Sequence, residues 1–366
     1  MRASASDGNR FRTKGVDSAV RRRRVAARQE PLASRLSLFV LGLFLLTLPG
    51  GLIVLALPSA GIAQEALSVD PNLPPYEPLD GLEGTLISVG SDTLNNLMAL
   101  WSDGFRRYYP HVRFEIEGKG SSTAPPALVA GTAQLGPMSR EMKASEIDQF
   151  EARYGYPPAQ IRVALDALAV YVHRDNPIQG LTIAQVDAIF SKSRLCGYPE
   201  NVTTWGQVGL TGAFANRPIS LYGRNSASGT YGFFKENALC GGDFKDEVKE
   251  QPGSASVVQG VTVDLYGIGY SGIGYRTSGV RAVPLAVHEG EPPAEPTLEN
   301  VISGAYPLGR FLYIYINKTP GQPLEPVVRE FLRYVLSREG QEAVIRDGYL
   351  PLPAEVVEAE LVKLED

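Results

Sequence analysis

After residue 84, short apolar runs typical of strands alternate with segments whose hydrophobic residues have helical spacing. Thr85–Val89, Val112–Ile116 and Gln134–Met138 are short apolar runs typical of strands. Between and after these runs, apolar residues recur at three- and four-residue spacing, from Leu94 to Tyr108 and from Ile147 to Tyr154, which indicates helices. Strands that alternate with helices predict an α/β fold built on a parallel sheet.

The same alternation continues to the end of the chain. Strands are expected over 167–172, 219–222 and 311–316, and helices over 183–190, near 229–239 and over 328–336. Residues 273–275 end a stretch rich in glycine and tyrosine, and we expect them to continue a strand.

The first 63 residues have the order of a secretory signal. A basic run precedes an apolar stretch over 36–57, and the small residues of 58–63 suit cleavage after Ala63. Because the uncharged stretch is also long enough to span a bilayer, a retained membrane anchor formed by residues 36–57 stays an alternative. Residues 64–80 are rich in proline and are expected to be a linker.

Charge is divided unevenly along the chain. The net charge is −5, yet residues 1–35 carry ten of the 35 basic and three of the 40 acidic side chains, which leaves 25 basic and 37 acidic residues, or −12, for the rest. Such an acidic body argues against nucleic acid as a partner. Two cysteines and three histidines argue against a zinc cluster, and we expect no metal and no cofactor.

The two cysteines have two open interpretations. An oxidising compartment permits a disulfide between Cys196 and Cys240, and neither residue lies in an apolar run, which favours the bridge. Two buried free thiols are the alternative.

Three strand-to-helix turns are rich in glycine and hydroxyl residues: 90–93, 118–123 and 224–230. In a parallel sheet such turns meet at the carboxyl ends of the strands, where ligands bind. Free backbone N–H groups, hydroxyls and the positive ends of helix dipoles suit a small oxyanion, and Arg224 adds a planar guanidinium. Ser139 and Arg140 follow a further strand end in the same way. Ordinary helix capping by each turn, and an ordinary surface position for Arg140, are the alternatives.

At these turns the chain resembles the phosphate-binding proteins of bacterial high-affinity phosphate ABC transporters, over residues 82–353. The strongest piece is Arg224-x-x-x-Ser228-Gly229-Thr230, which looks like the family's phosphate motif. Ser121 matches the serine of the family's glycine-serine loop, and Thr93 its first-turn threonine. The turns and the resemblance together give this expected phosphate site: Thr93, Leu94, Ser121, Ser139, Arg140, Arg224, Ser228, Gly229 and Thr230.

The resemblance implies a two-lobed periplasmic binding protein, type II-like, with a mainly parallel sheet flanked by helices in each lobe. Lobe I is expected to comprise 81–165 plus 307–366, and lobe II 166–306. A two-strand hinge would cross near 166–169 and 306–313, so that the lobes close around the anion. The chain would be a periplasmic monomer and not an enzyme, and it would bind inorganic phosphate and deliver it to an inner-membrane ABC permease.

Two alternatives to phosphate binding remain, and two residues depart from the family's pattern. Another tetrahedral oxyanion such as sulfate is one alternative, and a secreted phosphatase or hydrolase that uses Ser228 or Ser121 is the other.

Ser139 stands where the family often has an aspartate that accepts the proton of HPO₄²⁻, which puts discrimination against sulfate in doubt. Ser226 stands where an aspartate commonly pairs with the arginine of the motif.

Overall fold

The computed structural model describes residues 67–365. The expected signal or anchor in residues 1–63 lies outside the described residues, and so does the alternative span over 36–57. Among residues 67–365, no helix is both long and apolar enough to cross a bilayer. We keep lobe I and lobe II as names for the two parts expected from the sequence.

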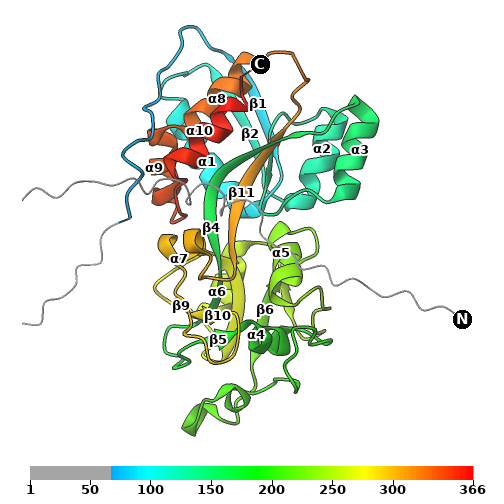
Figure 1. Cartoon of the computed structure of the whole chain (residues 1–366), viewed down its shortest axis with the longest axis vertical. Helices are drawn as coiled ribbons and strands as arrows, with labels where there is room; N and C mark the ends of the chain where they lie inside the picture. The colour runs from blue at the N-terminus through cyan, green and yellow to red at the C-terminus, as the bar shows by residue number, and fades with distance from the viewer. Residues whose placement is uncertain (1–66, 366) are drawn as a thin grey trace, which may run out of the picture. The chain divides into compact units, whose positions relative to one another are not determined.

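Lobe I is built on β1, β2 and β3, with helices packed around them (Figure 1). β1 pairs in parallel with β2, as the alternating pattern predicts, and a bridge between Ser88 and Leu135 adds the segment before β3. The elements of this lobe are β1 (Gly84–Val89), α1 (Asn95–Phe105), β2 (Val112–Glu117), α2 (Ala124–Ala130), β3 (Gly136–Met138), α3 (Ala144–Tyr154), α8 (Pro326–Leu336), α9 (Arg338–Arg346) and α10 (Ala354–Val362).

Lobe II contains a parallel group of three strands, with β6 between β7 and β8. A small parallel pair, β5 with β10, lies outside the large sheet. The elements of this lobe are β5 (Leu181–Thr182), α4 (Ile183–Phe190), β6 (Ser220–Arg224), α5 (Gly229–Ala238), β7 (Lys249–Gln251), α6 (Ser254–Thr262), β8 (Gly267–Gly272), β9 (Val280–Ala282), β10 (Leu285–Ala286) and α7 (Leu298–Ser303).

Five short 3-10 helices complete the described secondary structure. They are η1 (Asp92–Leu94), η2 (Ser121–Thr123), η3 (Trp205–Val208), η4 (Gly212–Phe214) and η5 (Ile273–Tyr275). The last of these corrects the expectation of a strand over 273–275. The backbone N–H of Ile273 donates to Asp166 Oδ1 instead of a neighbouring strand, so the ladder of β8 with β4 ends at Gly272.

Two long strands run between the lobes. β4 (Ala159–His173) pairs with β11 (Gly309–Ile316) along its first part and with β8 and β9 along its second part (Figure 1). The change of partner falls between Ala167 and Leu168, inside the expected crossing.

The large sheet is mixed because the two hinge strands pair antiparallel, whereas the pairs of β1 with β2 and of β6 with β7 and β8 are parallel, as expected within the lobes. β4 pairs antiparallel with β11, β8 and β9, and β3 pairs antiparallel with β11. The chain leaves lobe I through β4 and returns to it through β11, so these two neighbouring strands run in opposite directions and pair antiparallel.

The core explains why the helical pattern appears in the sequence. α1 buries Leu97, Met98, Trp101 and Phe105 at the expected three- and four-residue spacing.

The proline-rich segment before β1 has no helix or strand among its described residues 67–80. It is nevertheless anchored, because Tyr76 is buried against this core and its backbone N–H donates to a carboxylate oxygen of Glu339.

Candidate anion-binding site

Hydroxyl side chains from four turns converge at one place. Thr93 Oγ1 lies 2.9 Å from Thr230 Oγ1, and Ser139 Oγ lies 3.3 Å from Ser121 Oγ and 3.4 Å from Thr230 Oγ1. Ser91 Oγ donates to Ser139 Oγ over 3.1 Å. We call this set the hydroxyl cluster; its members, all buried, are Ser91, Thr93, Ser121, Ser139 and Thr230.

Thr230 reaches the cluster from lobe II, whereas the other members come from lobe I. Thr230 lies in the first turn of α5, and the others follow β1, β2 and β3. The strand-to-helix turns therefore meet as the α/β pattern predicts. A first-turn position also gives the cluster the positive end of the α5 dipole.

Two glycines allow the turns of the two lobes to touch. A Cβ on Gly229 would lie 2.1 Å from Ser121 Oγ, and a Cβ on Gly120 would lie 2.5 Å from the carbonyl oxygen of Ala227. Gly120 also has a φ of 128°, which side chains rarely adopt. Across the same contact, Ser122 N–H donates to Ala227 O. Both glycines are thus required by close approach and not only by turn geometry.

Arg224 is buried and pairs with Asp92, the residue between Ser91 and Thr93 of the cluster. Its Nη1 lies 3.0 Å from Asp92 Oδ2 and donates to Ser254 Oγ at 2.7 Å, and its Nη2 donates to Pro252 O at 3.2 Å. Its Nε has no hydrogen-bond partner among the described residues. Burial lowers the pKa of Arg224, and the charge of Asp92 opposes that effect. An unpartnered N–H on a buried guanidinium is a donor that an anion can satisfy.

A second buried arginine, Arg310, was missed by sequence reasoning. It lies at the start of β11, and its Nε and Nη2 donate to Asp166 Oδ2 at 2.9 and 2.7 Å. Its Nη1 donates to Ser139 O, and Nη2 also reaches Thr230 Oγ1 at 3.1 Å. The available signal was one charged residue at the head of each apolar run, Arg310 before 311–316 and Asp166 before 167–172, some 144 positions apart.

Arg140 forms an ion pair with a carboxylate of its own lobe, that of Glu146. Its Nη1 and Nη2 donate to the two carboxylate oxygens of Glu146, each at 2.7 Å, and Nη2 also reaches Ser122 Oγ. Burial raises the pKa of Glu146, but hydrogen bonds from Arg140 and from the Lys143 N–H outweigh it, so the pKa is lowered overall. Because Glu146 accepts from both ends of its guanidinium, Arg140 is held beside the glycine-serine turn by a local pair.

The remaining expected residues serve the local backbone. Ser228 is the N-cap of α5, and its Oγ accepts from Tyr231 N–H. Gly229 is the first residue of that helix. Leu94 ends η1 and is fully buried, and Thr93 O next to it accepts from Tyr349 Oη at 2.8 Å.

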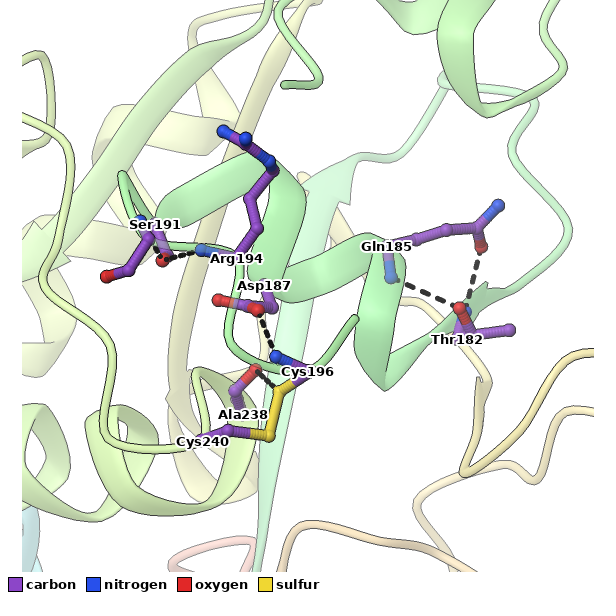
Figure 2. The surroundings of a disulfide bond; sticks show 9 residues. Thr182, Gln185, Asp187, Ser191, Arg194, Cys196, Ala238 and Cys240 are labelled. Atoms are coloured by element: carbon purple, nitrogen blue, oxygen red, sulfur yellow. Dashed lines mark hydrogen bonds between the residues drawn. A yellow bond between two sulfur atoms is a disulfide. The ribbon is translucent and has the colours of Figure 1, made fainter. Parts of the chain in front are cut away.

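The disulfide between Cys196 and Cys240 is formed, which confirms the expected bridge and excludes two free thiols (Figure 2). It ties the loop after α4 to the residues that follow the last turn of α5. Cys196 N–H donates to Asp187 Oδ2 at 2.7 Å, and burial raises the pKa of that carboxyl group. The bridge therefore anchors the far end of the helix whose first turn carries Thr230.

Known proteins resemble this chain over most of its length. The model of a family described as a PBP superfamily domain matches residues 77–339. The phosphate-binding protein PstS of Pseudomonas aeruginosa is 57% identical over 304 residues, which are 83% of this chain and 94% of that protein. A PstS of Staphylococcus epidermidis is 26% identical over 78% of this chain and 84% of that protein.

Solved structures agree with the fold. A putative phosphate ABC transporter substrate-binding protein from Clostridium perfringens, with bound phosphate, has a TM-score of 0.62 at 24% identity and covers 74% of this chain and all of that one. A possible phosphate-binding protein from Planctomyces limnophilus has a TM-score of 0.57 at 25% identity, over 78% of this chain and 100% of that one. From the matched family model and the 57% identity, the chain belongs to the PBP superfamily and, within it, to the family of the PstS phosphate-binding proteins.

Proposed function

We propose that this protein binds inorganic phosphate between its two lobes and delivers it to an ABC transporter permease. The observation that carries the proposal is the buried hydroxyl cluster, to which Arg310 donates directly and which adjoins, through Asp92, the buried Arg224 with its unpartnered Nε. Guanidinium N–H groups make strong, charge-assisted hydrogen bonds to phosphate oxygens, and hydroxyls supply further donors. The 57% identity to a PstS phosphate-binding protein points to the same anion.

The proposed site would take the nine residues expected from the sequence, with Arg310 added. Arg310 donates to Thr230 Oγ1, and Thr93 Oγ1 lies 2.9 Å from the same hydroxyl. A phosphate oxygen at this point would meet hydroxyls of both lobes and one cation. Arg140 stays in the proposal through its contact with Ser122 Oγ, although its strongest bonds go to Glu146.

The lobe boundaries at 165/166 and 306/307 remain part of the proposal. Closure would rotate the lobes about β4 and β11, where the chain passes between them. A periplasmic location, export by the segment before residue 64, a monomeric state and docking on an inner-membrane permease complete it. A membrane anchor over 36–57 remains the alternative to export with cleavage.

The enzyme alternative has little support at its two serines. Among the described residues, Ser121 Oγ bonds with Ser139 alone, and Ser228 Oγ accepts only from Tyr231 N–H. A nucleophilic serine needs a base within hydrogen-bond reach, and none of these contacts is one. We therefore propose a binding protein rather than a hydrolase.

Calorimetric titration with phosphate, arsenate and sulfate tests the proposal. We expect a dissociation constant for phosphate of about 1 μM or lower, which corresponds to about 8 kcal/mol. We also expect sulfate to compete. Discrimination needs a carboxylate that is free to accept the proton of HPO₄²⁻ and that repels a fully ionised anion. Ser139 carries no charge, and both carboxylate oxygens of Asp166 already accept hydrogen bonds from the protein. No heat and no thermal shift with millimolar phosphate would refute phosphate binding, and turnover of a chromogenic phosphate ester would favour the enzyme.

A further inference from the structure

Asp92 is a lobe I residue that is bound mainly by lobe II. Its Oδ2 lies 3.0 Å from Arg224 Nη1 and accepts from the Ser254 N–H at 2.8 Å. Its backbone carbonyl accepts from Tyr275 Oη at 2.9 Å. A Cβ on Gly253 would lie 3.1 Å from Asp92 Oδ1, so this side chain also packs against the start of α6. Three separate elements of lobe II thus hold one aspartate of lobe I.

Arg224 depends on this contact for its counter-charge. Its side chain is 1% exposed, and Asp92 is its one ion-pair partner among the described residues. Ser226, two residues further along the turn, is exposed and neutral. A buried cation without a nearby anion is costly, so the turn of lobe II cannot neutralise Arg224 by itself.

The same contact decides which edge of the guanidinium is offered. Asp92 and Ser254 Oγ both engage Nη1, and Pro252 O engages Nη2. Nε is left unpartnered. The pair therefore holds the guanidinium by its terminal nitrogens, and Nε is the nitrogen of this group that has no partner among the described residues.

We propose that Asp92 is a positioning residue that supplies the counter-charge of Arg224 across the two lobes, so that Arg224 is oriented for the anion only when the lobes are together. The identity of the ligand in this inference rests on the proposed phosphate binding, whereas the contacts of Asp92 do not depend on it. A counter-ion within lobe II would orient Arg224 in any arrangement of the lobes. A counter-ion from lobe I couples that orientation to closure, and it adds an ion pair and an N–H bond to the closed arrangement.

The test compares Asp92→Ala and Asp92→Asn with the wild type by phosphate titration and stopped-flow release. Asp92→Ala should weaken phosphate binding by about tenfold or more, chiefly through faster release, because a partner of a buried charge pair is lost. Asp92→Asn keeps the size but loses the charge, and should fall between. Asp103→Ala is the matched control, because it removes an exposed aspartate of α1 whose ion-pair partner, Arg106, directly follows the same helix.

A double variant separates positioning from mere structural support. Adding Ser226→Asp to Asp92→Ala places a carboxylate on the exposed turn of lobe II, two residues from Arg224. This second substitution should reverse about half or more of the fold-loss in phosphate affinity that Asp92→Ala causes, although it does not restore the contact to Ser254. A purely structural role for Asp92 would instead lower the melting temperature and leave both affinity and release unchanged, which overturns the proposal.

A ligand-free measurement keeps this test independent of the proposed function. Small-angle scattering without phosphate should give a larger radius of gyration for Asp92→Ala than for the wild type, since a bond between the lobes has been removed. If both proteins scatter alike, the coupling to closure is wrong. If the wild type fails to bind phosphate but the radii differ as expected, the proposed ligand is wrong and the coupling stands.

Discussion

Arg140 and Arg224 offer the most instructive comparison in this molecule. Arg140 lies two residues after β3, and Arg224 is the last residue of β6; both are buried, and both were expected to bind the anion. Arg140 is gripped at both terminal nitrogens by Glu146, six residues away. Arg224 meets its carboxylate, Asp92, across the lobes and keeps a free Nε. The two arginines thus differ in where the counter-charge comes from: Glu146 pairs with Arg140 inside lobe I, whereas Asp92 of lobe I pairs with Arg224 of lobe II.

The largest effect should come from removing Arg310, the cation at the crossing. Arg310→Met leaves Asp166 buried without its partner, and we expect the free energy of unfolding to fall by about 3–5 kcal/mol. Chemical denaturation at constant pH measures this change. The double variant that adds Asp166→Asn should lose clearly less, because no buried charge remains. Equal losses in the single and double variants would contradict the role of this pair.

The next effect concerns anion binding and tests the comparison directly. Arg224→Ala should weaken phosphate binding at least tenfold, by about 1.5–3 kcal/mol, because a charge-assisted bond from its free edge is lost. Arg140→Ala is the matched variant, and its effect on affinity should be several-fold smaller because Glu146 already occupies that guanidinium. Titration calorimetry measures both. A larger loss for Arg140→Ala would reverse the assignment of the two arginines.

The smallest effect compares a paired carboxyl group with one that forms no ion pair within residues 67–365. Burial raises the pKa of Asp347 to about 7, whereas the pKa of Glu146, bound by Arg140, is lowered. In the unfolded chain Asp347 loses its proton near pH 4, so its contribution to stability declines as pH rises from about 4 to about 7. Glu146 has the opposite sign: its stabilisation is present above its unfolded pKa and is lost as pH falls through its lowered pKa.

Asp347→Asn tests this sign by thermal unfolding at two pH values. The variant should melt at a higher temperature than the wild type near pH 7.5, and the gap should close at about pH 3, where the wild-type carboxyl group is protonated in both states. A gap that is the same at both pH values would mean that burial of this charge has no part in stability.

Much of the fold follows from local pattern. The apolar spacing gave α1 and α8, and the short apolar runs gave β1, β2 and β3, because burial of one face imposes a period on the sequence. The length of β4 could not be predicted in the same way. Its residues 159–166 are more mixed, and they are strand because β11 lies beside them. The turn at 273–275 escaped because one side chain, Asp166, bonds its first N–H.

The site divides along the same line. The sequence by itself determined the hydroxyl-rich turns, the glycines and Arg224, because local turn geometry and capping select these residue types. It also determined the two cysteines, whose pairing the structure completes. Only the tertiary structure decided that Arg310 joins the site with Asp166, that Glu146 engages Arg140, and that Asp92 serves Arg224. Each of these outcomes depends on which charges come within about 3 Å after folding, and the strength of a buried charge depends on that distance and on the loss of water around it.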